Sequence, residues 1–239
     1  MQTTAKGWNI IDASAGVLSC TYSFSKGATA NCFTARMASG GLAVISPPSV
    51  FTDALLEELT KFGPVEAIVA NNGFHHLGVG PWRRRFPSAR CFAAPGAIQR
   101  INKKSRDAGE LEPLRELAPL LAEGVEVVET PSSRCGETWA RARVEGGYAW
   151  YASDLLANMP LPSSFFLRLL FKWTGSGPGY KPFNLAHKLI LKDRKATLRA
   201  MLEDVRAHPP SVMVPGHGEL LRADTIADET EALLARATR

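Results

Sequence analysis

The chain has 239 residues, of which 45% are hydrophobic and 21% are charged. This composition is typical of a globular protein with a sizeable core. It excludes a disordered chain, and no apolar stretch reaches the roughly 18 residues of a membrane-spanning helix. The net charge of +5 is a small excess of basic residues, and the densest basic cluster is Arg83 to Arg85. We interpret these arginines as a solvated helix face and expect no nucleic-acid partner.

The predicted elements before residue 130 alternate between strands and helices. Residues 51–62 and 111–121 have helical character, and the first of these helices can start at Ser49 or Thr52, with Asp53 near its positive end. Five short apolar runs are typical of buried strands. They are Ala30 to Met37, Leu42 to Ile45, Ala67 to Ala70, Cys91 to Ala94 and Val125 to Val128.

The same alternation continues after residue 130. Arg141 to Tyr151 is predicted to form one or two strands around a Gly-Gly turn. Lys192 to Ala207 is a strongly amphipathic helix, Ser211 to Val214 is a buried strand, and Ala223 to Arg239 is a polar terminal helix. No linker rich in Pro, Gly or Ser divides the chain, so the pattern predicts one layered α/β domain over residues 1–239.

The cysteines and the N-terminal segment bear on the compartment. The four cysteines, Cys20, Cys32, Cys91 and Cys135, lie far apart and form no C-x-x-C pair. Met1 to Gly16 lacks the charged-then-apolar pattern of a secretory signal. We therefore expect a cytoplasmic protein with reduced thiols and no transmembrane segment.

Residues able to bind a metal follow three of the predicted strands. His75 and His76 follow the strand that ends at Ala70, Asp154 follows the strand that ends at Tyr151, and His217 follows the last strand. Imidazole and carboxylate are ligands that zinc, iron and manganese accept, and strand-end loops are where α/β scaffolds place functional groups.

The turn around His217 is the most specific of these signals. It reads Pro215-Gly216-His217-Gly218, and its two glycines allow the backbone to bring one histidine close to a ligand. The other histidines, His187 and His208, are interpreted as structural or surface residues.

The order of these segments resembles the metallo-β-lactamase and glyoxalase II superfamily. The resemblance extends from about Asn31 to Glu219 and implies an α/β fold of four layers, an αββα sandwich. It also implies an inserted loop or lid at about residues 160–185. The aromatic part of that segment, residues 160–181, could instead belong to the core, to a homodimer contact or to a membrane surface.

The metal-binding loops depart from the family pattern. The family loop His-x-His-x-Asp-His, laid on Asn71 to His76, has Asn71 and Gly73 at its first two histidines and His75 at its aspartate. A further family histidine should fall within residues 130–137, where none occurs. The histidines of one metal site are therefore missing.

The second metal site is retained in part. The resemblance implies a reduced site for one divalent metal, with His75, His76, Asp154 and His217 as ligands. Zinc is the expected metal, with iron or manganese as other options, and a metal-free site is also considered. Four ligands in a tetrahedron would leave no open position, so catalysis would need an expanded shell or a displaced ligand such as Asp154.

The leading functional hypothesis is a metal-dependent hydrolase of a small-molecule substrate. Asp154 and His76 are the predicted catalytic residues, and a metal there would lower the pKa of a bound water to about 7 for attack on an ester, thioester, amide or phosphoester. Asn72 and Arg134 are predicted to bind substrate, Arg134 by supplying positive charge where the other metal is missing.

Two alternatives stay open. The chain could be a metal-free, degenerate scaffold that binds a ligand or partner through the old cleft. A nuclease is less favoured because the chain has no room for an additional nucleic-acid-binding domain. Two of the predicted ligands also have structural interpretations, since His75 could hydrogen-bond nearby backbone and Asp154 could cap a helix that begins at Leu155.

Overall fold

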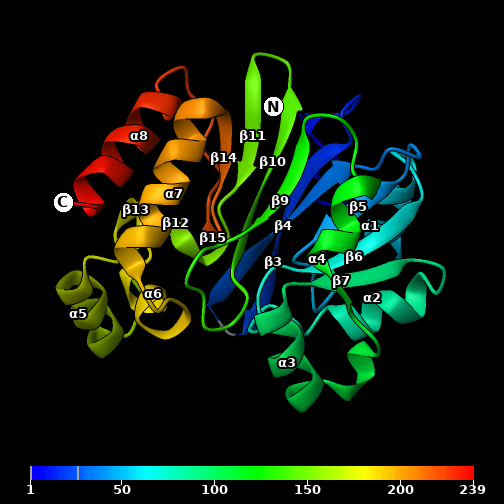
Figure 1. Ribbon diagram of the computed structural model, residues 1–239, viewed down its shortest axis with the longest axis horizontal. Coiled ribbons are helices and arrows are strands. Elements are labelled where there is room, and N and C mark those ends of the chain that lie inside the picture. Colours follow the sequence, from blue (N-terminus) through cyan, green and yellow to red (C-terminus); the bar gives the residue numbers. More distant parts are fainter. Residues whose placement is uncertain (1, 26) are drawn as a thin grey trace.

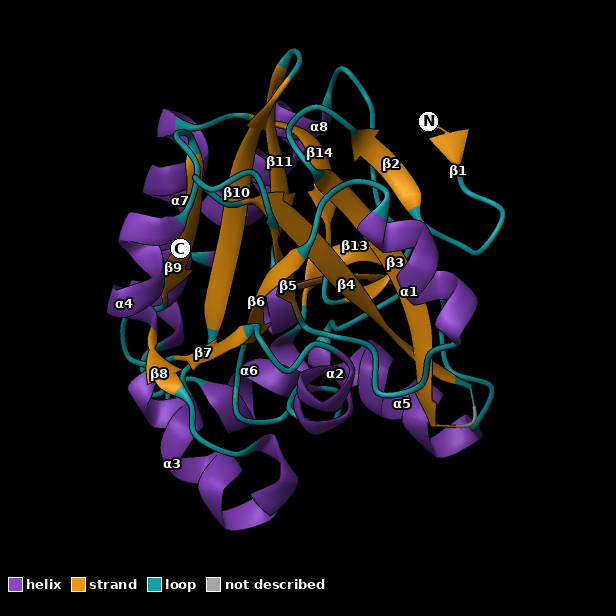
Figure 2. Cartoon of the chain, turned by 90° about the vertical axis from the view of Figure 1, so that its right-hand side faces the viewer, coloured by secondary structure: helices purple, strands orange, loops and turns teal. Residues whose placement is uncertain are grey.

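The computed structural model describes residues 2–25 and 27–239 and places two β-sheets face to face. Figure 1 shows helices α7 and α8 on one outer side and α1 and α2 on the other, with the sheets between them. Figure 2 shows the long strands of the two sheets in a view turned by 90°. The helices are α1 (Asp53–Thr60), α2 (Val79–Arg85), α3 (Pro95–Lys104), α4 (Leu114–Leu117), α5 (Phe165–Thr174), α6 (Asn184–Ile190), α7 (Arg194–Ala207) and α8 (Ile226–Ala237).

The first sheet contains eight strands in sequential order. They are β1 (Gln2–Thr3), β2 (Asn9–Asp12), β3 (Val17–Ser25), β4 (Ala28–Arg36), β5 (Leu42–Ile45), β6 (Val65–Ala70), β7 (Arg90–Ala93) and β8 (Glu112–Pro113). Strands β1 to β5 pair antiparallel, whereas β5 to β8 pair parallel. Every residue of β5, which pairs antiparallel with β4 and parallel with β6, is buried, as expected for a strand covered on both faces.

The second sheet has the order β14-β11-β10-β9, and a small third sheet has the order β13-β12-β15. Their strands are β9 (Val125–Glu129), β10 (Thr138–Val144), β11 (Gly147–Tyr151), β12 (Leu156–Met159), β13 (Gly179–Pro182), β14 (Pro210–Val214) and β15 (His217–Gly218). Strand β14 pairs parallel to β11. The carboxyl ends of β11 and β14 therefore lie side by side, and they lead to Asp154 and to His217.

Three apolar clusters hold the layers together. The first lies between the sheets, where Phe33 and Val69 of the first sheet share a cluster with Tyr151 and Val214 of the second. The second joins the first sheet to α1, α2 and α3. The third joins the second sheet to α6, α7 and α8. The fold is therefore the predicted αββα sandwich, because each sheet buries one face on the other sheet and one face on helices.

Most of the predicted elements are confirmed. The strand at Leu42–Ile45 and the C-terminal end of the helix at Ala207 agree residue for residue, and Thr52 is the N-cap of α1, where it accepts from the Leu55 amide at 3.2 Å. The Arg83 to Arg85 cluster ends α2 as a helix face, with exposed ion pairs to Asp107 and Asp53.

One predicted helix is wrong, and several elements were not predicted: strands β1, β2, β3, β12, β13 and β15, and helices α3 and α6. Residues 111–121 form strand β8, one turn of α4 and a 3-10 turn, η2 (Ala118–Leu120). Pro113 and Pro119 lack the amide protons that a continuous helix needs. Strands β2 and β3 were not predicted, because the outer part of β3 is exposed and the strand lacks a continuous apolar run.

No described helix is long and apolar enough to cross a membrane. The four cysteines are all buried and free. The segment predicted as an inserted loop or lid contains α5 and β13, and α5 has no buried residue. Two further 3-10 turns are η1 (Arg106–Ala108) and η3 (Ser153–Leu155).

His187 joins α6 to the turn that carries Asp154. Its side chain is 2% exposed, and its Nε2 donates to the carbonyl oxygen of Leu155 at 2.8 Å. Burial disfavours the charged imidazolium and lowers the pKa of His187 to about 4. This histidine is structural, as the sequence predicted.

We expect the free energy of unfolding to fall as the pH drops from 6.5 toward 4. In that window the unfolded chain protonates His187 and the folded chain does not. The contribution reaches about 3 kcal/mol at the lower end. Urea denaturation at about pH 7 and about pH 5 checks this, with His187→Gln as the non-titrating control that keeps a donor for Leu155. An equal loss of stability in both proteins would contradict the assignment.

Candidate metal centre

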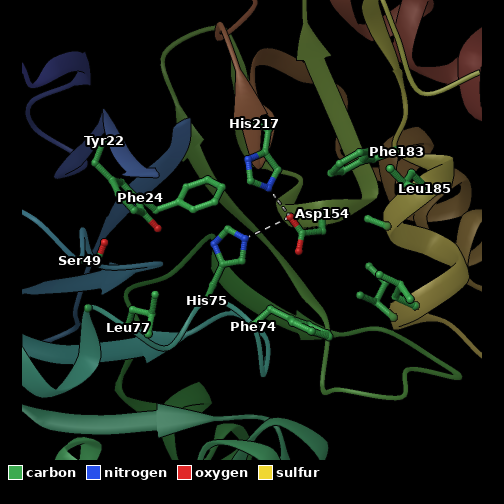
Figure 3. Close-up of a pocket in the computed structure, with 14 residues that line it drawn as sticks. Tyr22, Phe24, Ser49, Phe74, His75, Leu77, Asp154, Phe183, Leu185 and His217 are labelled. Carbon is green, nitrogen blue, oxygen red and sulfur yellow. Dashed lines mark hydrogen bonds and ion pairs between the residues drawn. The ribbon is translucent and has the colours of Figure 1, made fainter. Parts of the chain in front are cut away.

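Three side chains converge at one end of the sheets. The Nε2 atom of His75 lies 3.2 Å from Oδ1 of Asp154, and Nε2 of His217 lies 3.0 Å from the same oxygen. One ligand atom from each residue fits within a mutual distance of 4.8 Å. Figure 3 shows the two imidazole rings directed at the Asp154 carboxylate. Two imidazoles and one carboxylate are a donor set suited to a divalent transition metal.

Three loops position these ligands. His75 lies in the loop after β6, Asp154 in the 3-10 turn after β11, and His217 at the start of β15 after β14. The last two loops touch, because the Gly216 amide donates to the carbonyl oxygen of Ser153 at 2.7 Å. A Cβ atom on Gly216 would lie 2.2 Å from that oxygen. A glycine is thus required beside His217, as the turn sequence indicated.

A buried asparagine in β4 holds the His217 turn from the other side. The side-chain amide of Asn31 donates to the carbonyl oxygens of Pro215 and Gly218, at 2.8 and 2.7 Å. Its backbone amide donates to the carbonyl oxygen of Gly216. Asn31 was not predicted as a site residue, although a lone polar residue inside an apolar strand was the available signal.

Two serines next to the site have strained backbones. Ser46, after β5, has φ of 56° and Ser153, before Asp154, has φ of 51°. Left-handed conformations are uncommon for residues with a Cβ and concentrate at functional sites. Ser46 contacts Nδ1 of His75 at 3.0 Å through Oγ, and its Oγ lies 3.2 Å from the Tyr22 hydroxyl. The strain therefore belongs to groups that hold the ligands.

The second nitrogen of each histidine ring determines what the first can offer. Nδ1 of His217 lies 2.6 Å from the carbonyl oxygen of Thr29 and must donate to it. In the neutral tautomer Nε2 then directs a lone pair at Asp154, so a cation or a second proton is needed there. Such an outer hydrogen bond is the usual way of orienting a metal-binding histidine. The residues therefore fit a bound divalent metal.

The charges in the metal-free protein follow from the same contacts. Burial opposes a charge on His217, but the hydrogen bond and the negative charge of Asp154 outweigh it and raise the His217 pKa. Burial also opposes ionisation of Asp154, yet His75 and His217 hold its pKa well below the ordinary value. Asp154 is thus an ionised carboxylate, and His217 next to it is protonated more readily than a free histidine.

A second buried acid lies behind Asp154. Asn72 donates from Nδ2 to Oδ2 of Asp154 at 2.9 Å and to Oε2 of Glu137 at 2.7 Å. Oε1 of Glu137 accepts from the Asp154 amide at 3.1 Å. Burial and the nearby Asp154 charge raise the pKa of Glu137 well above its usual value. Sequence reasoning missed Glu137, although an acid directly before a buried strand is an informative signal.

The predicted site residues are only partly brought together. His75, Asp154 and His217 meet, whereas His76 is not part of their cluster. Asn72 turns the chain here, because its Oδ1 accepts from the amides of Phe74 and His75 at 2.7 and 2.9 Å.

Two predicted roles are not favoured by these positions. His76 is half-buried, and its Nδ1 has no partner among the described residues. Burial, followed by the positive charge of Arg100, lowers the pKa of His76 despite a backbone hydrogen bond. Asn72 is fully buried and faces Asp154 and Glu137, an arrangement that suits positioning of Asp154 better than contact with substrate.

His75, Asp154 and His217 line a pocket of about 380 Å³. Its walls are mainly apolar, and Figure 3 shows Phe24, Phe74, Leu77, Phe183 and Leu185 around the centre. Arg134 lines a neighbouring pocket of about 250 Å³ together with Arg100, Lys103 and Lys104. Phe74 and Leu189 line both pockets and form the boundary between them.

Solved structures identify the fold. TMB-1 superposes with a TM-score of 0.62 at 14% identity, covering 98% of this chain and 99% of that one. The DIM-1 metallo-β-lactamase superposes with a TM-score of 0.61 at 13% identity, covering 99% and 100%. The chain has the metallo-β-lactamase fold. A metal-soaked Flv1 flavodiiron core from Synechocystis sp. PCC6803 is similar to it over 97% of this chain and 62% of that chain (TM-score 0.60, 15% identity).

No family model matches the chain, and no curated protein matches it in sequence. At 12 to 15% identity the structural neighbours show the fold alone. Function must therefore be argued from the site within the metallo-β-lactamase fold.

We expect Gly216→Ala to displace His217, because the new Cβ would overlap the Ser153 carbonyl. The free energy of unfolding should fall by about 3 kcal/mol. The pKa of His217 should also fall, since its hydrogen bond to Asp154 raises it. Thermal unfolding and NMR titration of the histidine imidazoles measure both.

The matched control is Gly146→Ala, where an added Cβ meets nothing within 4 Å. Its positive φ should cost about 1 kcal/mol of stability and leave the His217 pKa unchanged. An unchanged His217 pKa in Gly216→Ala would show that the close contact does not position the histidine.

Proposed function

We propose that this protein is a metal-dependent hydrolase in which His75, Asp154 and His217 hold one divalent ion, with zinc as the first candidate and iron or manganese as others. The proposal is carried by the convergence of two Nε2 atoms and one carboxylate oxygen on the floor of an apolar pocket. His76 is left out of the ligand set. Three protein ligands are the number found in catalytic zinc sites, which keep a position open.

A divalent ion in this place would supply Lewis acidity and lower the pKa of a water molecule to about 7. Asp154 is held for this task from behind, because Asn72 fixes Oδ2 and leaves Oδ1 for the centre. With neutral His75 in place of an acid, Asp154 is the one anion among the three ligands. The net charge of the loaded centre would stay positive and favour an oxyanion.

The pockets support a substrate class. The apolar walls next to the metal centre suit an acyl or aromatic group. The basic side chains of the adjoining pocket suit an anionic group on the same molecule. We therefore favour an ester or thioester that joins an apolar acid to an anionic leaving group. Arg134 keeps its predicted role as a substrate-binding residue, now through this second pocket.

A metal-free binding protein is the second candidate. The observation that favours it is the mutual hydrogen bonding of the three residues, in which His75 and His217 both contact Oδ1 of Asp154. These contacts satisfy the buried carboxylate without an ion.

Metal content separates the two candidates. Protein purified without a histidine tag should contain about one equivalent of a divalent metal by mass spectrometry. His75→Ala and His217→Ala should each lose at least about tenfold in affinity, and His76→Ala should retain the metal as the matched control. Loss in His76→Ala with retention in His75→Ala would overturn the ligand set. No metal after incubation with zinc, iron or manganese would leave the binding protein as the better account.

Arg134 tests the substrate class. The side chain is exposed, and its Nε donates to the carbonyl oxygen of Leu191 at 2.8 Å. We expect Arg134→Ala to raise KM for an anionic thioester by about tenfold with little change in kcat, since it would remove binding shared by substrate and transition state. Arg115→Ala, on an exposed arginine in α4, is the control. An unchanged KM in Arg134→Ala would refute the role.

A further inference from the structure

Helix α5 presents an apolar face that no described residue covers. Phe165, Phe166, Leu169 and Trp173 are 71, 80, 58 and 81% exposed. Their spacing of three, four and eight residues places them on one side of the helix. Phe165 and Phe166 pack edge to face, with ring centroids 5.8 Å apart. We call these four residues the α5 face. Large apolar groups gathered in this way indicate an interaction surface.

The opposite side attaches α5 to the protein. The ring of Phe171 lies 6.1 Å from that of Phe183, just before α6, and the Thr174 hydroxyl lies 2.8 Å from Oγ of Ser176. The side-chain amide of Asn184 donates to the carbonyl oxygen of Thr174 at 2.9 Å. Gly175 has φ of 66° and ends the helix. The α5 face is thus held outward by a folded helix.

The sequence segment that contains α5 carries charges of a single sign. Residues 160–192 contain five basic residues and no acidic one. They are Arg168, Lys172, Lys181, Lys188 and Lys192. The whole chain has 28 basic and 23 acidic residues, so the remainder has 23 of each and is neutral. The formal net charge of +5 therefore arises entirely in this one segment, although the small net charge of the whole chain does not reveal such a concentration.

The α5 face is continuous with the apolar mouth of the pocket. Leu189 of α6 is 65% exposed and lines the pocket, and α6 packs against α5. Lys188 lies 5.5 Å from the Trp173 ring. Phe24 and Leu77 on the other wall are also exposed. Figure 1 shows α5, α6 and α3 at the same end of the molecule.

We propose that α5 docks on an anionic lipid surface, with the α5 face in the interface and the mouth of the pocket turned toward it. An aromatic apolar face flanked by Arg168 and Lys172 is the pattern of a helix that lies in a membrane interface. Tryptophan favours that interface, and basic residues are attracted to anionic headgroups. This docking does not depend on the hydrolase activity proposed above.

A second copy of the chain fits this surface less well. In a twofold dimer the same patch faces itself. Arg168 and Lys172, on a helix without an acidic residue, would then be brought near the same two charges of the other copy. Anionic lipid supplies the opposite charge that a second copy lacks.

Trp173 provides a direct test. The other four tryptophans, Trp8, Trp82, Trp139 and Trp150, are at most 2% exposed, so a change in tryptophan emission reports Trp173. Vesicles of phosphatidylcholine with about one third phosphatidylglycerol should shift the emission to the blue, and pure phosphatidylcholine should shift it far less. Trp173→Phe should abolish the shift while co-sedimentation with the vesicles persists. No shift and no co-sedimentation with anionic vesicles would overturn the proposal.

Charge reversal distinguishes membrane binding through α5 from binding that depends only on the overall charge of the protein. The double substitution Arg168→Glu with Lys172→Glu should weaken co-sedimentation with anionic vesicles by at least about 30-fold. The control, Lys61→Glu with Arg115→Glu, changes the net charge equally at exposed sites on other helices and should leave binding nearly intact.

Three results would count against docking through α5. Equal loss in the two double variants would point to bulk charge instead. A lipid-free dimer, detected by light scattering and dissociated by Phe166→Ala with Trp173→Ala, would identify a second copy as the occupant. An altered far-ultraviolet circular dichroism spectrum in the Arg168/Lys172 variant, with Trp173→Ala binding normally, would assign the lost binding to misfolding.

Discussion

The buried carboxylate of Asp154 is the constraint on which the candidate site depends. A charge in this position is costly unless it is fully paired, and its partners come from distant parts of the chain. His75, His217 and Asn72 contact its two oxygens, and the Asp154 amide donates a hydrogen bond to Glu137. These contacts tie the loops after β6, β11 and β14 to one point. The site is thus also a structural joint between the two sheets.

The three converging residues include a single acidic side chain, that of Asp154. Glu137, the acid behind Asp154, has a pKa well above its usual value because of burial and the nearby charge of Asp154. Asp154 then balances the whole centre alone. With His76 outside the cluster, three donors converge where the sequence suggested four. A centre with three donors retains room for a substrate or a water molecule, which a closed tetrahedron would not.

The surroundings of the centre are divided by polarity. One pocket is walled by aromatic and aliphatic side chains, and its neighbour is lined by Arg100, Lys103, Lys104 and Arg134. The α5 face extends the apolar wall to the surface, and the sequence segment that contains it, residues 160–192, accounts for the formal net charge of the chain. Apolar and cationic groups therefore share one end of the molecule, an arrangement suited to amphiphilic, anionic ligands and surfaces.

Much of the fold could be predicted from the sequence, because buried strands and amphipathic helices leave local patterns of apolar residues. The run at Leu42–Ile45 and the Pro215-Gly216-His217-Gly218 turn are examples, and the second also indicated a site residue. Local patterns could not show which of two adjacent histidines faces Asp154. That was decided by tertiary structure, since Asn72 folds the loop and Ser46 holds His75. Glu137 and Asn31 were missed for the same reason: their partners lie in turns and loops that follow other strands, and only the packing of the two sheets brings them into contact.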